Sequence, residues 1–219
     1  MLEILQNDIQ AGVILIVVLI FSLCFHEFSH AYIAYRLGDN TAAYQGRLTL
    51  NPLAHLDPIG SIMLLLVGFG YAKPVPINPM NFNNPRKDSM KVGFAGPASN
   101  ILLCLLGCLI MRILGVENLL EVGRRGVELT VLGTILYYFS SINMTLAIFN
   151  LIPIHPLDGG QIFGGFLDKI NPGLSNKLRE HGPKALMAII FLGIFTGFSI
   201  IGLLIYPFQY LVTLMAGLY

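Results

Sequence analysis

Two histidines and a glutamate near the N-terminus form a group that could carry out hydrolytic chemistry. The sequence reads His26-Glu27-Phe28-Ser29-His30. Because His26 and His30 are four residues apart, both imidazoles face the same side of a helix, about one turn apart. This spacing lets them coordinate one Zn²⁺ ion, and Glu27 can act as general base toward a metal-bound water. The group therefore predicts a hydrolytic zinc site with one Zn²⁺ per chain.

The helix that carries this group is expected to cross a membrane. Of the 219 residues, 55% are hydrophobic and only 11% are charged, whereas about a quarter of the residues of a soluble domain are charged. A net charge of +1 gives no sign of a nucleic-acid partner. The first apolar run has no charge from Ile9 to His26, and it predicts a retained span over residues 9–35. Ionisable groups inside such a span are costly, which favours a functional role for them.

Other apolar runs complete the predicted architecture. Three of them reach the length of about 20 residues that a span requires, and they predict spans over 92–111, 129–150 and 185–206. The last run continues past an interruption at Pro207, and the placement of 207–219 stays open. A fifth run, 58–72, has only 15 residues and several glycines, so we expect it to re-enter or to lie buried. We predict an all-α polytopic membrane protein, a helical transmembrane bundle with a short re-entrant or β-like segment between the first two spans, forming one membrane-embedded domain over 1–219.

A catalytic zinc site usually has three protein ligands and a water, so a third ligand must come from elsewhere in the chain. The remaining candidates are histidines and loop aspartates near apolar segments: His55, His155, His181, Asp57, Asp158 and Asp168. Asp158 follows a long apolar helix, at a point where two prolines break the helix and two glycines permit a tight backbone. A broken helix at membrane depth can line a cavity. A carboxylate at this place can therefore meet a metal.

Three ordered motifs resemble the site-2 protease family of intramembrane zinc metalloproteases. They are HEFSHA in the first span, GPASN at the start of the next and FNLIPIHPLDGG at the end of a third. The match covers residues 22–163, and the segments GRLTLNP and AKPVPINP are similar to compact bacterial members, which lack a PDZ domain. The resemblance implies that Glu27 is the catalytic base and that Asn150 contacts the substrate backbone. It also implies three zinc ligands: His26, His30 and Asp158.

Two further positions belong to these motifs without a defined role. Asn100 ends the Gly-Pro-x-x-Asn segment, which lies near the active site in proteins of this family. His155 stands where the third motif more often has proline. Its interpretation is open between a competing ligand, a substrate contact and a loop residue.

A shared zinc ion also constrains the topology. The HExxH and LDG motifs must lie at similar depth, so their helices must run in the same direction, with one span (92–111) between them and 58–72 not crossing. Ten of the 13 basic residues then lie on one face, and Arg112, Arg124 and Arg125 lie on the other. The positive-inside rule predicts a multi-pass protein of the cell membrane, with the N-terminus outside and the active site toward the cytoplasmic side.

The leading hypothesis is an intramembrane zinc metalloendopeptidase that hydrolyses peptide bonds in or near transmembrane segments, as in regulated intramembrane proteolysis. Its partners are a transmembrane protein substrate and the lipid bilayer, and the sequence makes no prediction of oligomeric state. Weak alternation over Gly46 to Asn51 suggests a strand edge for an extended substrate. The alternative is a membrane zinc transporter that uses the same His and Asp ligands, which gives Glu27 no task. A dinuclear iron oxygenase is set aside because it needs more than the five histidines present.

Overall fold

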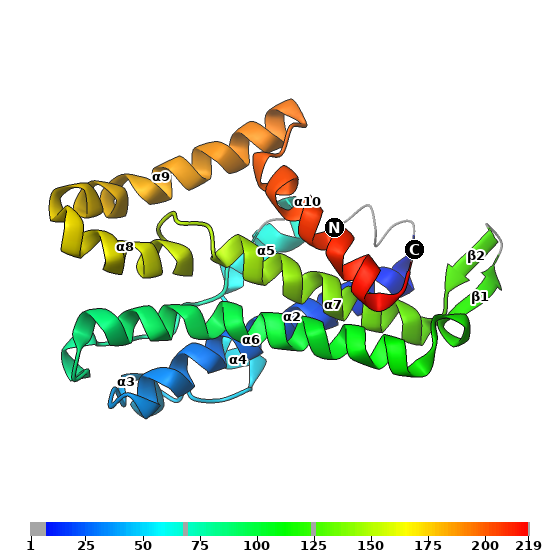
Figure 1. Ribbon diagram of the computed structural model, residues 1–219, viewed down its shortest axis with the longest axis horizontal. Helices are drawn as coiled ribbons and strands as arrows, with labels where there is room; N and C mark the ends of the chain where they lie inside the picture. Colours follow the sequence, from blue (N-terminus) through cyan, green and yellow to red (C-terminus); the bar gives the residue numbers. More distant parts are fainter. Residues whose placement is uncertain (1–7, 68–69, 124–125, 219) are drawn as a thin grey trace.

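The computed structural model describes residues 8–67, 70–123 and 126–218, and helices dominate them (Figure 1). The α-helices are α2 (Ile9–Arg36), α3 (Thr41–Tyr44), α4 (Pro52–His55), α5 (Pro58–Val67), α6 (Pro85–Leu114), α7 (Val131–Asn150), α8 (Asp158–Ile170), α9 (Pro172–Thr196) and α10 (Ile200–Ala216). The 3₁₀ helices are η1 (Pro79–Asn81) and η2 (Val116–Leu119). The strands are β1 (Leu120–Gly123) and β2 (Gly126–Leu129).

Three long helices form the body of the protein. α6 packs against both α2 and α7 and runs in the opposite direction to them (Figure 1). All three are long and apolar enough to cross a bilayer. Because α2 and α7 run the same way, the HExxH group and the segment after α7 lie toward the same side, which a shared metal ion requires. The prediction of an all-α polytopic membrane protein is confirmed.

The last apolar run is broken at a different place from the one predicted. α9 and α10 meet at an 85° bend, whereas the sequence predicted one span over 185–206 and an interruption at Pro207. Gly197 ends α9 in the left-handed region, with a φ of +72°, which glycine adopts without steric strain. Ser199 then caps α10, because its side chain accepts a hydrogen bond from the Gly202 amide at 2.9 Å. Pro207 lies inside α10, and Tyr219 lies outside the described residues.

The short apolar segment at 58–72 contains α5, which has ten residues and is therefore about 15 Å long. That is half the thickness of a bilayer core. Its two flanks lie together, because Leu56 and Ala72 form an antiparallel bridge. Gly60 approaches the backbone of Tyr71 so closely that a Cβ atom would lie 2.1 Å from the Tyr71 carbonyl oxygen. The two ends of the segment therefore lie next to each other. Residues 68 and 69, within it, lie outside the described residues.

The two strands lie between α6 and α7, whereas the sequence predicted a β-like segment between the first two spans. β1 and β2 form an antiparallel hairpin, with Leu120 opposite Leu129, and α7 begins only at Val131. Residues 46–51 form turns and irregular backbone, so the predicted strand edge in that segment is wrong. Arg124 and Arg125, which entered the charge count, lie outside the described residues.

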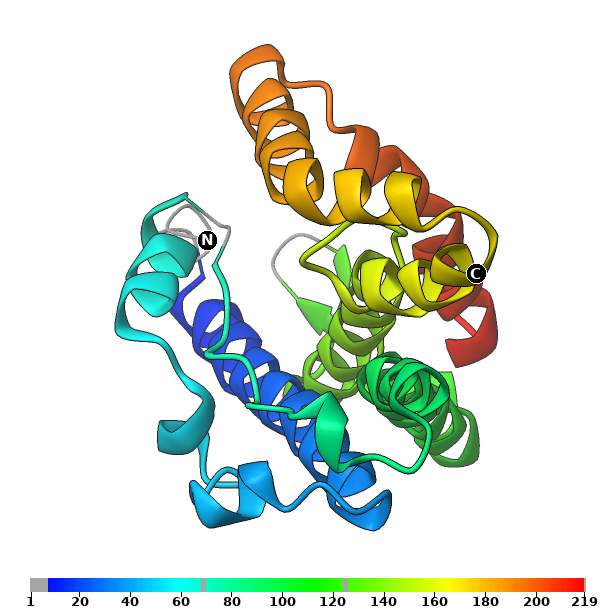
Figure 2. The ribbon, with the colours of Figure 1, turned by 90° about the vertical axis from the view of Figure 1, so that its left-hand side faces the viewer.

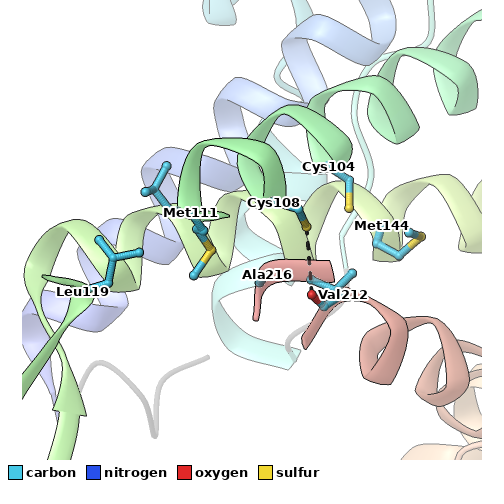
Figure 3. Packing of buried hydrophobic residues seen from close by; sticks show 8 residues of the cluster. Cys104, Cys108, Met111, Leu119, Met144, Val212 and Ala216 are labelled. Atoms are coloured by element: carbon cyan, nitrogen blue, oxygen red, sulfur yellow. Dashed lines mark hydrogen bonds between the residues drawn. The ribbon is translucent and has the colours of Figure 1, made fainter. Parts of the chain in front are cut away.

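α10 is held to the bundle by a buried hydrophobic cluster between α6, α7 and α10 (Figure 3). Cys104 and Cys108 belong to this cluster, and both are free thiols. The Cys108 Sγ atom points at the Val212 carbonyl oxygen, 4.0 Å away (Figure 3). At the same end, Arg112 donates to the Met215 carbonyl at 2.8 Å. These contacts fasten the C-terminal half of α10, while its N-terminal half diverges toward α9.

A buried carboxylate joins the loop after α2 to the loop before α6. Asp39 is fully buried, and it accepts from the Thr41 amide at 3.1 Å, the Asn78 amide at 2.7 Å and the Asn81 Nδ2 at 2.7 Å. Burial raises the pKa of Asp39, but the hydrogen bonds from Thr41, Asn78 and Asn81 outweigh it and lower the pKa overall.

Asp39→Ala is therefore expected to destabilise the protein by about 2–4 kcal/mol, because several buried donors lose a charged acceptor. In a protein of this size that corresponds to a melting temperature lower by roughly 4–16 °C. Since the folded pKa of Asp39 lies below its usual 3.8, the stabilisation is complete above about pH 4 and is lost as the pH falls through the folded pKa. Thermal unfolding in detergent at pH 7 and at acid pH measures this. A difference from wild type that widens at acid pH contradicts the prediction.

Candidate active site

Three ligand atoms from two distant parts of the chain converge at the site. His26 and His30 are on α2, and Asp158 is the first residue of α8. The two histidine Nε2 atoms are 3.0 Å apart. Asp158 places its Oδ2 3.1 Å from His26 Nε2 and its Oδ1 3.3 Å from His30 Nε2. Among the described residues these form the one group of at least three His, Cys, Asp or Glu that could hold a metal ion.

Hydrogen bonds on the far side of each ring determine the histidine tautomers. His26 Nδ1 donates to the side-chain oxygen of Asn100 at 2.6 Å, and His30 Nδ1 donates to the Val92 carbonyl at 2.7 Å. Both partners are acceptors, so each neutral ring carries its proton on Nδ1 and turns a bare Nε2 lone pair toward Asp158. This second shell is the usual way in which a protein orients histidine ligands to a metal.

The site fits a zinc ion. With both rings neutral and protonated on Nδ1, two lone pairs and a carboxylate face one another, and a cation between them offsets their repulsion. Ligands of a tetrahedral zinc ion with Zn–N bonds of ~2.0–2.1 Å lie about 3.3 Å apart, close to the separations observed here. The Asp158 Oδ2 atom is buried and has no hydrogen-bond partner. Beside it, Gly96 leaves room, since a Cβ there would lie 2.4 Å from His30 Nε2.

Glu27 faces the same cavity as the ligand group. This cavity, of about 430 Å³, is lined by Glu27, by the three ligands and by Asn150. The Glu27 Oε2 atom accepts a hydrogen bond from the Val75 amide at 3.2 Å, so the carboxylate is anchored beside the ligands. Asn150 ends α7, and its Nδ2 donates to the Leu146 carbonyl at 3.0 Å.

A second cavity, of about 470 Å³, adjoins the first. Its lining comes from α2, α7, α9, α10 and α5 with its flanking residues, and most of the side chains are aliphatic or aromatic. The two cavities share six residues: Leu23, Gly70, Tyr71, Ala72, Leu146 and Phe149. In the end-on view of Figure 2, α5 and α9 stand on opposite sides of this space. The cavity that contains the ligand group thus adjoins an apolar chamber.

The other candidate ligands lie elsewhere. His55 donates to the Thr49 carbonyl at 2.7 Å, and His155 packs against α8 and α9, close to Gly164 and Gly182. Neither joins the ligand group described above. Asp168 belongs to the α8–α9 junction, where burial raises the pKa of its carboxyl but hydrogen bonds from Ser175 and Arg179 lower it overall. The competing-ligand interpretation of His155 therefore has no support from this geometry.

Several residues that shape the site were not assigned a role from the sequence. Gly96 and Asn100 entered only as the first and last residues of the GPASN motif, and Ser22 and Asn143 were not singled out. Ser22, Asn100 and Asn143 are polar, fully buried and in membrane-spanning helices. Polar residues of this kind are expensive inside a bilayer, so their presence in apolar runs was the available signal.

The fold and the site together define a membrane-embedded metallohydrolase of the HExxH class. Comparison with known families gives the same result in finer terms: residues 14–193 match Peptidase family M50. The chain belongs to this family and is a zinc metalloprotease, and the resemblance to site-2 proteases is confirmed. No solved structure matches the chain.

Similar proteins named as zinc metalloproteases come from bacteria and an archaeon. YwhC of Bacillus subtilis is 41% identical over 169 residues, which are 76% of this chain and 73% of YwhC. Rip2 of Mycolicibacterium smegmatis is 30% identical over 74% of this chain and 60% of its own length. MJ0392 of Methanocaldococcus jannaschii is 28% identical over 95% of this chain and 50% of its own length. The chain thus spans most of YwhC but only half to three fifths of the other two.

Proposed function

We propose that this metalloprotease is an intramembrane endopeptidase that cleaves peptide bonds in or near the transmembrane segments of other membrane proteins, as in regulated intramembrane proteolysis. The observation that carries the proposal is the position of the ligand group. It lies among membrane-spanning helices, and its cavity joins an apolar chamber between those helices. A soluble peptide needs no such chamber, whereas a substrate segment with apolar side chains can bury them against its apolar lining.

In this proposal His26, His30 and Asp158 hold the zinc ion. Bound zinc lowers the pKa of a water and polarises a carbonyl group. Glu27 takes the proton of the attacking water and delivers it to the leaving amine, which needs a carboxylate within hydrogen-bond reach of both. Asn150 contacts the backbone of the substrate next to the scissile bond, as the family resemblance implies.

We further propose a multi-pass protein of the cell membrane with the N-terminus outside and the active site toward the cytoplasmic side. The charge distribution supports this orientation. The C-terminal end of α2, the N-terminal end of α6 and the α8–α9 junction lie at one end of the molecule (Figure 1). These carry Arg36, Arg86, Lys87, Lys169 and Lys177, as the positive-inside rule expects of a cytoplasmic face.

The substrate class is tested by mapping cleavage sites in membranes. Wild type and Glu27→Gln are expressed separately in the same host, and membrane proteins that accumulate at full length only with the variant are identified by mass spectrometry. We expect the cut sites to lie within an apolar segment or a few residues from its end. Cut sites confined to soluble loops would contradict intramembrane cleavage, even though the protein would still be a metalloprotease.

A further inference from the structure

Three buried polar side chains form a hydrogen-bonded chain behind His26, and the reaction described above does not use them. They come from three helices: Ser22 from α2, Asn100 from α6 and Asn143 from α7. Each is 0% exposed. In such surroundings every N–H and O–H group needs a defined partner, because water cannot replace a missing one. The direction of each hydrogen bond in the chain is therefore determined.

This direction can be followed from Ser22. Its hydroxyl donates to the Val18 carbonyl at 2.8 Å, so toward Asn143 it can only accept. The Nδ2 group of Asn143 donates to Ser22 Oγ at 2.9 Å and to the Phe139 carbonyl at 2.8 Å. Because both amide hydrogens are used, Asn143 turns its Oδ1 toward Asn100 and accepts from the Nδ2 of that residue at 2.7 Å.

The orientation of Asn100 in turn determines the tautomer of His26. Asn100 Nδ2 donates to Asn143 at 2.7 Å and, over a longer distance of 3.4 Å, to the Ser22 carbonyl. Asn100 therefore presents its Oδ1 to His26 and accepts from Nδ1 at 2.6 Å. The opposite amide orientation would present N–H groups to Nδ1, and the ring proton would move to Nε2. That atom faces His30 and Asp158, so a proton there would remove the lone pair that a metal needs. His30 has no such dependence, because its Nδ1 donates to a backbone carbonyl.

We propose that Asn143 is a positioning residue for His26. Through Asn100 it maintains the Nδ1–H tautomer and leaves Nε2 free for the zinc ion, and Ser22 completes the chain. The inference rests on the proposed role of His26 as a zinc ligand. It assigns to α7 a part in metal binding that is separate from Asn150.

Zinc affinity and thermal stability, measured on the purified full-length protein, separate this role from a merely structural one. Asn143→Leu removes the closer of the two acceptors of Asn100 Nδ2, leaves only the Ser22 carbonyl at 3.4 Å, and places an apolar side chain in an apolar bundle. We expect zinc affinity, measured by competition with a chelator, to fall about 10- to 100-fold, as for other changes behind a metal ligand. The melting temperature of the metal-free protein is expected to fall less than in Asn143→Asp, because leucine only takes one acceptor from a buried donor, whereas aspartate places a carboxyl group inside the bundle.

Asn143→Asp gives the opposite pattern. It keeps the acceptor for Asn100 but buries a carboxyl group and loses the donors to Phe139 and Ser22. We expect a lower melting temperature together with a zinc affinity within about threefold of wild type, well below the effect of losing an outer-shell partner. If the affinity instead follows stability through the series, the positioning role is wrong.

Two further variants complete the test. Ser140→Ala is the matched control, since Ser140 is fully buried on the same helix and donates to the Leu136 carbonyl at 2.9 Å, outside the chain. Its zinc affinity should equal that of wild type. Ser22→Ala serves if Asn143→Leu does not fold, and it should weaken zinc binding less than Asn143→Leu. Unchanged affinity in whichever of these two folds overturns the inference.

His26→Ala distinguishes this inference from the proposed function. If that variant binds zinc as well as wild type does, His26 is not a ligand and the proposed metal site is wrong. If it loses zinc while Asn143→Leu retains it, the metal site stands and only the positioning role of Asn143 fails.

Discussion

Purified Glu27→Gln protein is expected to cleave a membrane substrate about 10²–10⁴ times more slowly than wild type while it retains one zinc per chain. General acid–base groups contribute a factor of this size, and a glutamine amide can neither accept nor return the proton. Zinc should stay because Glu27 is not part of the ligand group. The side chain should also keep its position, because a glutamine oxygen can accept the same hydrogen bond from the Val75 amide.

Elemental analysis of the purified protein gives the zinc content, and single-turnover cleavage in detergent or proteoliposomes gives the rate. Glu180→Gln is the matched control, because Glu180 is an exposed residue of α9. Its rate should equal that of wild type. Undiminished cleavage by Glu27→Gln would show that Glu27 is not the base, and loss of zinc from that variant would show that Glu27 is a ligand instead.

Gly96→Ala is expected to abolish zinc binding and, with it, proteolysis. A Cβ atom at this position would lie 2.4 Å from His30 Nε2 and 2.6 Å from His26 Nε2, closer than non-bonded atoms approach. Neither ring can easily move away, because His26 Nδ1 is hydrogen-bonded to Asn100 and His30 Nδ1 is hydrogen-bonded to the Val92 carbonyl. We expect zinc affinity to fall by at least about 100-fold, the upper range for changes behind a metal ligand.

The adjacent turn of α6 supplies the control for this prediction. A Cβ atom on Gly93 would lie 3.4 Å from its nearest neighbour, on Ile162, which is an ordinary contact. Gly93→Ala therefore makes the same chemical change in the same helix and should retain zinc and activity. A Gly96→Ala protein with full zinc content would mean that the ion does not lie between the histidine Nε2 atoms.

The chemistry of the site was largely readable from the sequence because it depends on local geometry. His26 and His30 share a helix face through their spacing alone, and Glu27 adjoins them in the chain. The apolar runs predicted the three long helices to within a few residues at most ends, since the hydrophobic thickness of a bilayer sets their length. Asp158 required the motif around it, because a single aspartate carries no spacing signal.

Features that depend on local backbone competition were harder to predict. The hairpin strands β1 and β2 alternate apolar and polar residues, as Leu-Glu-Val and Val-Glu-Leu, but each has only four residues and the pair lies between two apolar helices. The break before α10 comes from a left-handed glycine and a serine cap, whereas a proline ten residues later is accommodated inside the helix. At the α9–α10 break, a few residues of capping chemistry outweighed the hydropathy of the longer run.

By itself, then, the sequence determined the membrane as the solvent, the three long helices and the histidine pair with Glu27, because each of these follows from composition or from spacing within one helix. Only the tertiary structure decided which partner each histidine has. Asn100 is 74 residues from His26 in sequence and Val92 is 62 residues from His30, and the packing of α6 against α2 brings each pair together. The tertiary structure also decided that Asn143 joins this network from a third helix. Hydrogen-bond direction is a property of the assembled bundle, where burial removes water as an alternative partner, and no pattern along one segment contains it.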